Sequence, residues 1–220
     1  MGSNPKTKMV GVYDGEKDHI EQLILNADYQ NCIKFCKSAI HRMKSNLKTI
    51  NNRHFMWYLH KHMGDCYFEL GQYNSAISIF LKGEECVPDE EYKYRLIWFR
   101  ALCHKKMNEL ETSLNLYNQC ISFYESSNRF DMAFTIKISV ADMLQDETTA
   151  GDAVSYLENY IKDDTIEKDN EIDYTIYLDE AYKTLALIQY NNGKQVMAYK
   201  SYKGIYNKEN YSELKEVILS

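Results

Sequence analysis

Proline and glycine are scarce in this chain, which has two prolines and nine glycines among 220 residues. Sheet proteins rich in hairpins and corners need many of both, so this scarcity disfavours an all-β fold. Hydrophobic residues make up 45% and charged residues 26% of the sequence, which is typical of a folded globular chain. The composition therefore favours a protein built mostly of helices.

The sequence also lacks any long apolar run. Its longest apolar stretches have four or five residues, whereas a membrane helix needs about 20, so no membrane partner is expected. The N-terminus has no apolar segment after its positive charges, and we expect no secretory signal there. The net charge of −6 comes without a run of lysines or arginines, so nucleic acid is not an expected partner either.

Motifs of metal, redox and catalytic sites are missing as well. The six cysteines have no CxxC spacing, which indicates reduced thiols in the cytoplasm, with the nucleus as an alternative. No nucleophile–base set, no phosphate-binding glycine loop and no HExxH motif occurs, so we expect no enzyme activity and no cofactor. His62 and Cys66 lie one helical turn apart, but His60 points about 200° away from His62 and no fourth ligand is near. We therefore expect no metal site.

One stretch of the sequence, residues 62–88, reads "HMGDCYFELGQYNSAISIFLKGEECVP" and carries the strongest pattern. Small residues at Gly64 and Ala76 would let two antiparallel helices approach closely, while Phe80 fills the space beside them. Gly71 suits the positive φ at the end of the first helix, and the closing proline stops the second. The stretch predicts a helix-turn-helix hairpin.

The same spacing of twelve residues between two small positions recurs along the chain. It joins Ala101 with Ser113, Ala141 with Ala153, Ala186 with Ala198, and, in a degenerate first copy, Ile20 with Cys32. The pattern resembles the tetratricopeptide repeat (TPR), whose period is about 34 residues. About five degenerate units follow, at 13–46, 57–90, 94–127, 134–167 and 179–212.

The resemblance implies an all-α, right-handed superhelical solenoid of antiparallel helix pairs, because a lone hairpin exposes too much apolar surface. Its concave groove would be lined by the first helix of each pair. Residues 1–12 are expected to form a flexible tail, and residues 213–220 a capping helix. The acidic stretch 162–174 is interpreted as a solvated connection, with a docking site for a basic partner as the alternative.

In TPRs, positions 2, 5, 9 and 12 of the first helix face the groove. Carried onto this sequence, the resemblance implies a peptide- or protein-binding groove formed by Tyr58, Lys61, Asp65, Phe68, Arg95, Trp98, Leu102, Lys105, Asp142, Lys183 and Tyr190. Arg95, Trp98 and Lys105 form its most suggestive patch, with aromatic area and donors for a carboxylate or a backbone carbonyl. The alternative is that long helices pack across the groove and bury several of these side chains.

Chaperone-binding TPRs hold a peptide's terminal carboxylate with a lysine and two asparagines. Lys61 matches the lysine, but Asp65 and Phe99 stand at the asparagine positions. An anionic Asp65 would repel a carboxylate, so binding of a chaperone tail is not expected.

Two functions remain open from the sequence. The first is a non-catalytic scaffold or adaptor that binds a peptide segment or helix of a partner protein, as do TPR subunits of large complexes such as the anaphase-promoting complex. The alternative is a peptide-sensing regulatory domain that resembles Gram-positive pheromone receptors. Those usually carry an N-terminal DNA-binding or effector domain, which the twelve residues before the first repeat cannot supply unless the sequence is a fragment of a longer protein. The sequence leaves the partner and the oligomeric state open.

Overall fold

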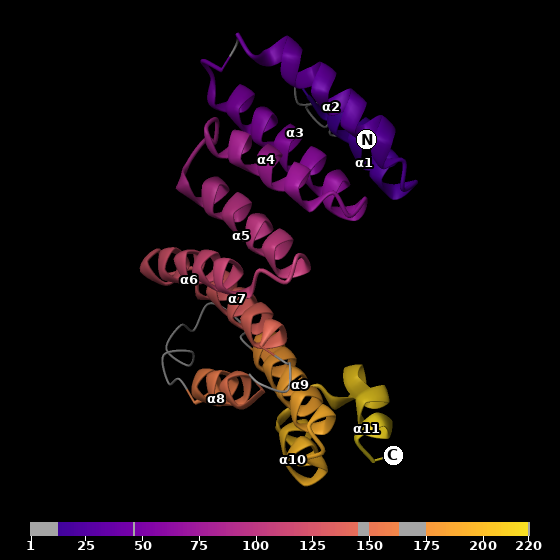
Figure 1. The fold of residues 1–220 in the computed structure, drawn as a ribbon, viewed down its shortest axis with the longest axis vertical. Coiled ribbons are helices and arrows are strands. Elements are labelled where there is room, and N and C mark those ends of the chain that lie inside the picture. The colour runs from indigo at the N-terminus through magenta and orange to yellow at the C-terminus, as the bar shows by residue number, and fades with distance from the viewer. Residues whose placement is uncertain (1–12, 46, 145–149, 163–174, 220) are drawn as a thin grey trace, which may run out of the picture. The chain divides into compact units, whose positions relative to one another are not determined.

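The computed structural model describes residues 13–45, 47–144, 150–162 and 175–219. All regular structure within these ranges is helical (Figure 1), so the predicted all-α class is confirmed. The predicted tail 1–12 and all but the first residue of the acidic stretch 162–174 lie outside the described residues. None of the described helices is long and apolar enough to cross a membrane.

The chain divides into two compact units, Met1–Met107 and Asn108–Ser220. Within the first unit each helix packs against the next along the chain. Its helices are α1 (Asp14–Leu25), α2 (Tyr29–Met43), α3 (Ile50–Glu69), α4 (Tyr73–Glu84) and α5 (Glu90–Lys106). The central helix α3 therefore lies between α2 on one side and α4 on the other.

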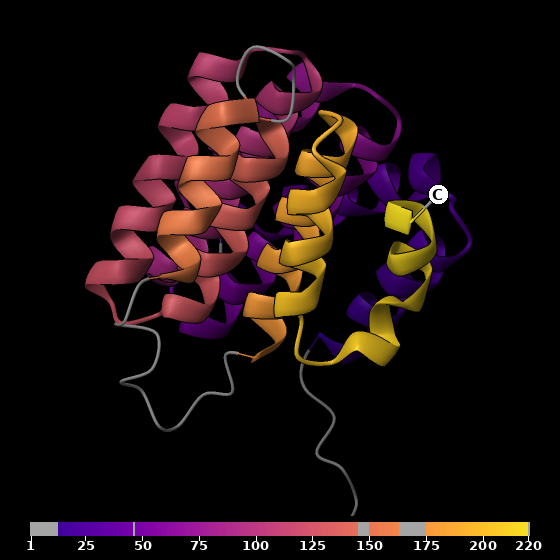
Figure 2. The same cartoon turned by 90° about the horizontal axis from the view of Figure 1, so that it is seen from below.

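The second unit continues the same construction and ends in an additional short helix. Its elements are α6 (Leu110–Ser126), α7 (Phe130–Met143), α8 (Ala150–Ile161), α9 (Thr175–Asn191), α10 (Gln195–Gly204), the 3-10 helix η2 (Lys208–Tyr211) and α11 (Ser212–Leu219). The last helix α11 packs against α9 and α10 (Figure 2, yellow). It buries Leu214 and Ile218 and leaves Val217 44% exposed.

The small positions of the repeat pattern are among the most deeply buried places in the structure. The residues at 101, 113, 141, 153, 186 and 198 are all 0% exposed. Gly64 lies so close to the ring of Phe80 that a Cβ atom at this position would collide with it. Close helix approach at small side chains is thus how the pairs α3 with α4, α7 with α8 and α9 with α10 bury their apolar faces.

Four turns between successive helices share one hydrogen-bond pattern. At Gly71, where φ is 71°, the backbone N–H donates to the carbonyl of Phe68, and the next N–H donates to that of Tyr67. Ala27 makes the equivalent bonds with φ at 54°, as do Asn128 and Gly193. Each is the left-handed residue that closes a helix in a Schellman motif.

The helices begin earlier than the repeat pattern indicates. The predicted units start at 57, 94, 134 and 179, whereas the corresponding helices start at Ile50, Glu90, Phe130 and Thr175. The side chains of Thr49 and Asp89 accept hydrogen bonds from the backbone N–H groups of Asn52 and Tyr92, which caps α3 and α5.

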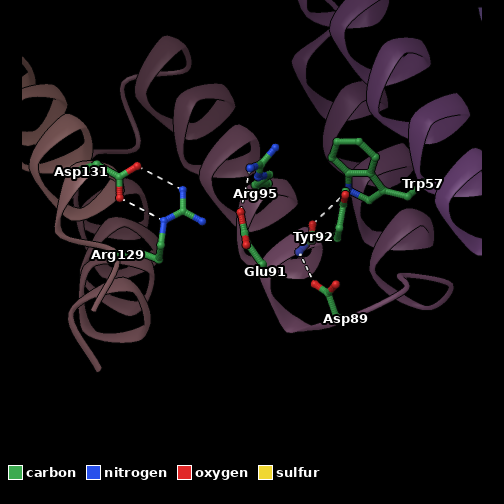
Figure 3. Close-up of polar contacts among 7 residues, drawn as sticks. All are labelled: Trp57, Asp89, Glu91, Tyr92, Arg95, Arg129 and Asp131. Atoms are coloured by element: carbon green, nitrogen blue, oxygen red, sulfur yellow. Dashed lines mark hydrogen bonds and ion pairs between the residues drawn. The ribbon is translucent and has the colours of Figure 1, made fainter. Parts of the chain in front are cut away.

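Polar contacts also position the start of α5 against α3 (Figure 3). The indole Nε1 of Trp57 donates to the carbonyl of Tyr92 at 3.0 Å, and the rings of these two residues meet edge to face. In the second unit, Arg129 forms a two-point ion pair with Asp131 at the start of α7, with both N–O distances 3.1 Å. Burial alone would raise the pKa of Asp131, but the hydrogen bonds from Arg129 lower it.

A buried carboxylate holds the turn that leads into the capping helix. Asp179 on α9 is 1% exposed and accepts hydrogen bonds from the backbone N–H groups of Tyr206 and Asn207, at 2.6 and 3.1 Å. The side-chain amide of Asn207 donates a third bond at 2.9 Å. The chain leaving α10 is therefore fixed to α9 before it enters η2.

The collision at Gly64 gives a first prediction. Gly64→Ala should lower the free energy of unfolding by roughly 1 to 3 kcal/mol, because the added methyl group displaces the Phe80 ring. Gly15→Ala is the matched control, since no atom lies within 4 Å of its added Cβ, and it should be neutral or stabilising by up to about 1 kcal/mol. Urea denaturation measures both. Equal stability of the two variants would contradict the packing argument.

The left-handed turn residues give a second prediction, in which alanine replaces glycine at one turn and glycine replaces alanine at another. Gly71→Ala should destabilise the protein by about 1 kcal/mol, since alanine is strained at positive φ and nothing else contacts the new Cβ. Ala27→Gly should stabilise it by a similar amount, because that strain is already present at φ 54°. Thermal unfolding should move in opposite directions for the two variants, and shifts of the same sign would refute the assignment.

Candidate functional site

Eight of the eleven predicted groove residues lie in the first unit, on α3 and α5. Four of these eight come together at a pocket of about 360 Å³: Lys61, Asp65, Phe68 and Leu102. The remaining walls come from residues that the repeat positions did not indicate, namely Ile24, Tyr29, Cys66, Glu69, Phe80 and Phe99. We call this cavity the α3–α5 pocket. Its lining is mostly apolar and aromatic, with charged groups from α3 alone.

The charged groups of the pocket are largely neutralised. Lys61 Nζ lies 2.8 Å from Asp65 Oδ2, with the two side chains 25% and 27% exposed. The same ammonium lies 5.4 Å from the centre of the Phe99 ring. Burial raises the pKa of Asp65, and Lys61 opposes this rise. The pocket is thus suited to an apolar group, and Lys61 is not an unpaired cation for a carboxylate.

Beside the pocket, His62 is buried in its neutral form. Its ring lies 4.2 Å from that of Tyr58, and its side chain is 16% exposed. Burial, and secondarily the charge of Lys61, lowers the pKa of His62 to about 4. Asp65 Oδ2 lies 3.5 Å from His62 Nδ1, but its charge is already compensated by Lys61 at 2.8 Å. The histidine therefore contributes packing here.

Tyr58 joins α3 to α1. Its hydroxyl donates to Glu21 Oε1 at 3.1 Å, and the ammonium of Lys17 lies 5.6 Å from the centre of its ring. Burial, followed by the charge of Glu21, raises the pKa of Tyr58. This predicted groove residue is part of a bridge between two helices.

The patch predicted on α5 is also internally paired. Arg95 Nη2 lies 2.7 Å from Glu91 Oε1, and its guanidinium lies 5.7 Å from the centre of the Tyr92 ring (Figure 3). Trp98 stacks on Phe99 with ring centres 5.9 Å apart. Lys105 is half-buried on the same helix. The patch keeps its aromatic area, but the positive charge of Arg95 is already paired with Glu91, although N–H groups other than those of Nη2 remain as donors.

The three predicted residues of the second unit have separate surroundings. Asp142 is exposed on α7. Lys183 pairs with Glu180 at 3.1 Å and lies 5.6 Å from the ring centre of Tyr211. Tyr190 packs, partly buried, against the hydrophobic cluster around α9 to α11. Much of the side chain of Lys183 and of Tyr190 is therefore in contact with other residues of the second unit.

The cysteines behave as structural residues. Cys32, Cys36 and Cys66 are buried at the α2–α3 interface, and all six thiols of the chain are free. A hydrogen bond with Cys32 and burial both raise the pKa of Cys36 and of Cys66. Over the described residues, no group of three or more histidine, cysteine or carboxylate side chains could hold a metal ion.

One pocket residue that was not among the predicted groove residues could have been found from the repeat positions. Positions 2, 5, 9 and 12 of the first unit are Asp14, Lys17, Glu21 and Ile24. Glu21 and Lys17 contact Tyr58, and Ile24 lines the pocket. The positional rule applied to the degenerate unit would have found them. Glu69 and Phe99 lie outside that rule, and only the packing of the helices brings them to the pocket.

No protein-family model matches this sequence, and no curated protein matches it either. Solved structures do match. The TPR-like repeats of a kinesin light chain from Podosopora anserina have a TM-score of 0.68 and 10% identity, covering 91% of this chain and 96% of that one. The chain therefore has a TPR-like helical-repeat fold, as its small-residue spacing predicted.

Two further matches are regulators in complex with peptides. The Rap conjugation gene regulator of plasmid pLS20, with the Phr* peptide, has a TM-score of 0.61 and 12% identity over 98% of this chain. NprR with its cognate peptide NprX has a TM-score of 0.52 and 16% identity over 89% of this chain. The chain spans 61% and 55% of the length of these two regulators.

The buried histidine gives a prediction about acid stability. The pKa of His62 is lower in the folded state than its ordinary value of 6.5, so its stabilising contribution is present above pH 6.5 and lost as the pH falls towards 4. A drop from 6.5 to about 4 corresponds to roughly 3 kcal/mol. His62→Phe should therefore show a smaller loss of unfolding free energy across this range than the wild type. Curves of the two proteins that stay parallel in urea titrations would contradict the prediction.

Proposed function

We propose that the protein is a non-catalytic scaffold or adaptor, and that its α3–α5 pocket binds an apolar side chain from a segment of a partner protein. The observation that carries this proposal is the pocket itself. It is about 360 Å³ in volume, lies on the face where four predicted groove residues meet, and has aromatic and aliphatic walls. Pockets of this size and composition are typical places for an anchoring side chain.

The pairing of the pocket's charges indicates how the segment is recognised. Lys61 is held by Asp65, and Arg95 by Glu91, so neither supplies an unpaired cation for a terminal carboxylate. Affinity would come from burial of an apolar anchor in a cavity that the helices have already formed, which costs little ordering on the receptor side. The oxygens of Asp65 would orient a backbone or side-chain donor of the ligand.

A peptide-sensing regulatory role is the second candidate, because the Rap and NprR regulators, both in complex with peptides, share the fold. Both roles use an apolar anchor in the same pocket. They differ in the ligand, which is a free short peptide in one case and a segment of a larger protein in the other. For either role we place the protein in the cytoplasm, where its six free thiols would stay reduced.

A display library of random peptides of about 12 residues, selected on the immobilised full chain, tests the pocket. Selected peptides should share an apolar or aromatic anchor. Leu102→Lys should weaken their binding by about tenfold or more, because it places an ammonium group against the apolar wall. Leu81→Lys is the matched control, since Leu81 is 43% exposed on α4 and does not line the pocket.

Equal binding of the selected peptides to both leucine variants would refute the pocket as the binding site. Affinity capture from cells with the same two variants then separates the two roles. A protein partner lost only with Leu102→Lys supports the adaptor, whereas capture of a short free peptide supports the sensor.

A further inference from the structure

A second groove crosses the opposite side of α3 in the first unit. Its cavity has a volume of about 610 Å³, with α2 and α4 as its walls and α3 as its floor. We call it the α2–α4 groove. It shares no lining residue with the α3–α5 pocket, so the pocket proposed above does not account for it.

The floor of this groove is apolar and its rim is basic. Met56 and Met63 of α3 form the floor, and both are 2% exposed. The rim carries the exposed side chains of Lys37, Lys44 and Lys82. Methionine side chains adapt to the shape of an incoming apolar group, and lysines attract carboxylates.

The charge of this rim is not compensated locally. In the part of the chain that the structure describes, no carboxylate forms an ion pair with Lys37, Lys44 or Lys82, and Glu85 is the single acidic residue that lines the groove. Three lysines against one glutamate leave a charge of +2 with the histidines neutral. This surplus belongs to a chain with a net charge of −6, so it is a local feature and not a consequence of composition.

The groove has the dimensions of a short helical segment. Its lining residues span about two helical turns on each of three sides: 37 to 44 along α2 and its C-cap, 56 to 63 on α3, and 79 to 86 along the end of α4 and the two residues after it. Two turns correspond to a length of about 11 Å. That length accommodates two or three apolar side chains spaced at i, i+3 or i+4, and i+7 on a partner helix.

We infer that the α2–α4 groove docks an acidic amphipathic segment of a partner protein, with its apolar side chains on the methionine floor and its carboxylates against Lys37, Lys44 and Lys82. A nucleic acid fits less well, because three lysines neutralise few phosphates and no phenylalanine, tyrosine or tryptophan among the described residues lines the groove for base stacking.

A synthetic helical peptide of about 14 residues tests this inference, with leucine at i, i+3, i+4 and i+7 and glutamate at most other positions. Fluorescence anisotropy with the full chain should show saturable binding that weakens as NaCl rises from about 50 to about 300 mM. Lys44→Glu with Lys82→Glu should weaken it by about tenfold or more. The control is Lys34→Glu with Lys106→Glu, two exposed lysines outside the groove that give the same change in net charge.

Three further measurements test the sign of the ligand's charge, the location of the binding site and the class of ligand. A peptide with lysine in place of glutamate should not bind, and Leu102→Lys in the α3–α5 pocket should leave binding of the acidic peptide within about twofold. A negative peptide-selection test of the α3–α5 pocket would therefore leave the acidic-peptide test of the α2–α4 groove unaffected. An oligothymidylate of about 14 nucleotides should bind more weakly than the acidic peptide.

The inference is overturned by equal binding of the acidic peptide to both double variants, by equal binding of the basic peptide, or by no saturable binding below about 1 mM. Tighter binding of the oligothymidylate, lost in Lys44→Glu with Lys82→Glu, would also overturn it and would assign the groove to nucleic acid.

Discussion

The close approach of paired helices at small side chains is the constraint on which the rest of this structure depends. Gly64 lies directly against the ring of Phe80, and the alanines at 76, 101, 141, 153, 186 and 198 are fully buried. The contact between Gly64 and Phe80 fixes how far apart α3 and α4 lie and which faces they turn towards each other. The sides of α3 that remain open follow from this, and the α3–α5 pocket and the α2–α4 groove lie on those sides.

Much of this architecture could be predicted from the sequence, because small residues at a fixed spacing have few other structural explanations. Glycine at 71 and 193 likewise marked turns, and both have φ of 71°. Ala27 and Asn128 occupy the same left-handed position without any glycine signal, in turns that make the same pair of hydrogen bonds. The repeat pattern did not predict that α3 begins as early as Ile50. This extension is stabilised by the cap at Thr49 and by contacts of α3 with α5.

The repeat positions predicted a set of side chains that face a groove, and four of them line the α3–α5 pocket, but the positions did not indicate what those side chains contact. Lys61 with Asp65 and Glu91 with Arg95 are spaced four residues apart on a helix, so their pairing was accessible from the sequence. The bond from Tyr58 to Glu21 joins residues 37 apart and depends on how α1 packs on α3. The pocket volume depends on five helices together, and no single repeat contains that information.

Helix α3 has a different chemistry on each of its two open sides. Lys61, Asp65 and Phe68 line one side and Met56 and Met63 the other, as expected for residues about half a turn apart on one helix. The charges of Lys61 and Asp65 on the first side cancel each other and leave that of Glu69, so a ligand there gains mainly from apolar burial. The lysines on the second side are not cancelled, so long-range attraction would add to its association rate. A partner that presents an apolar anchor and an acidic helix could use both sides, and linking two weak contacts in this way raises affinity without a larger pocket.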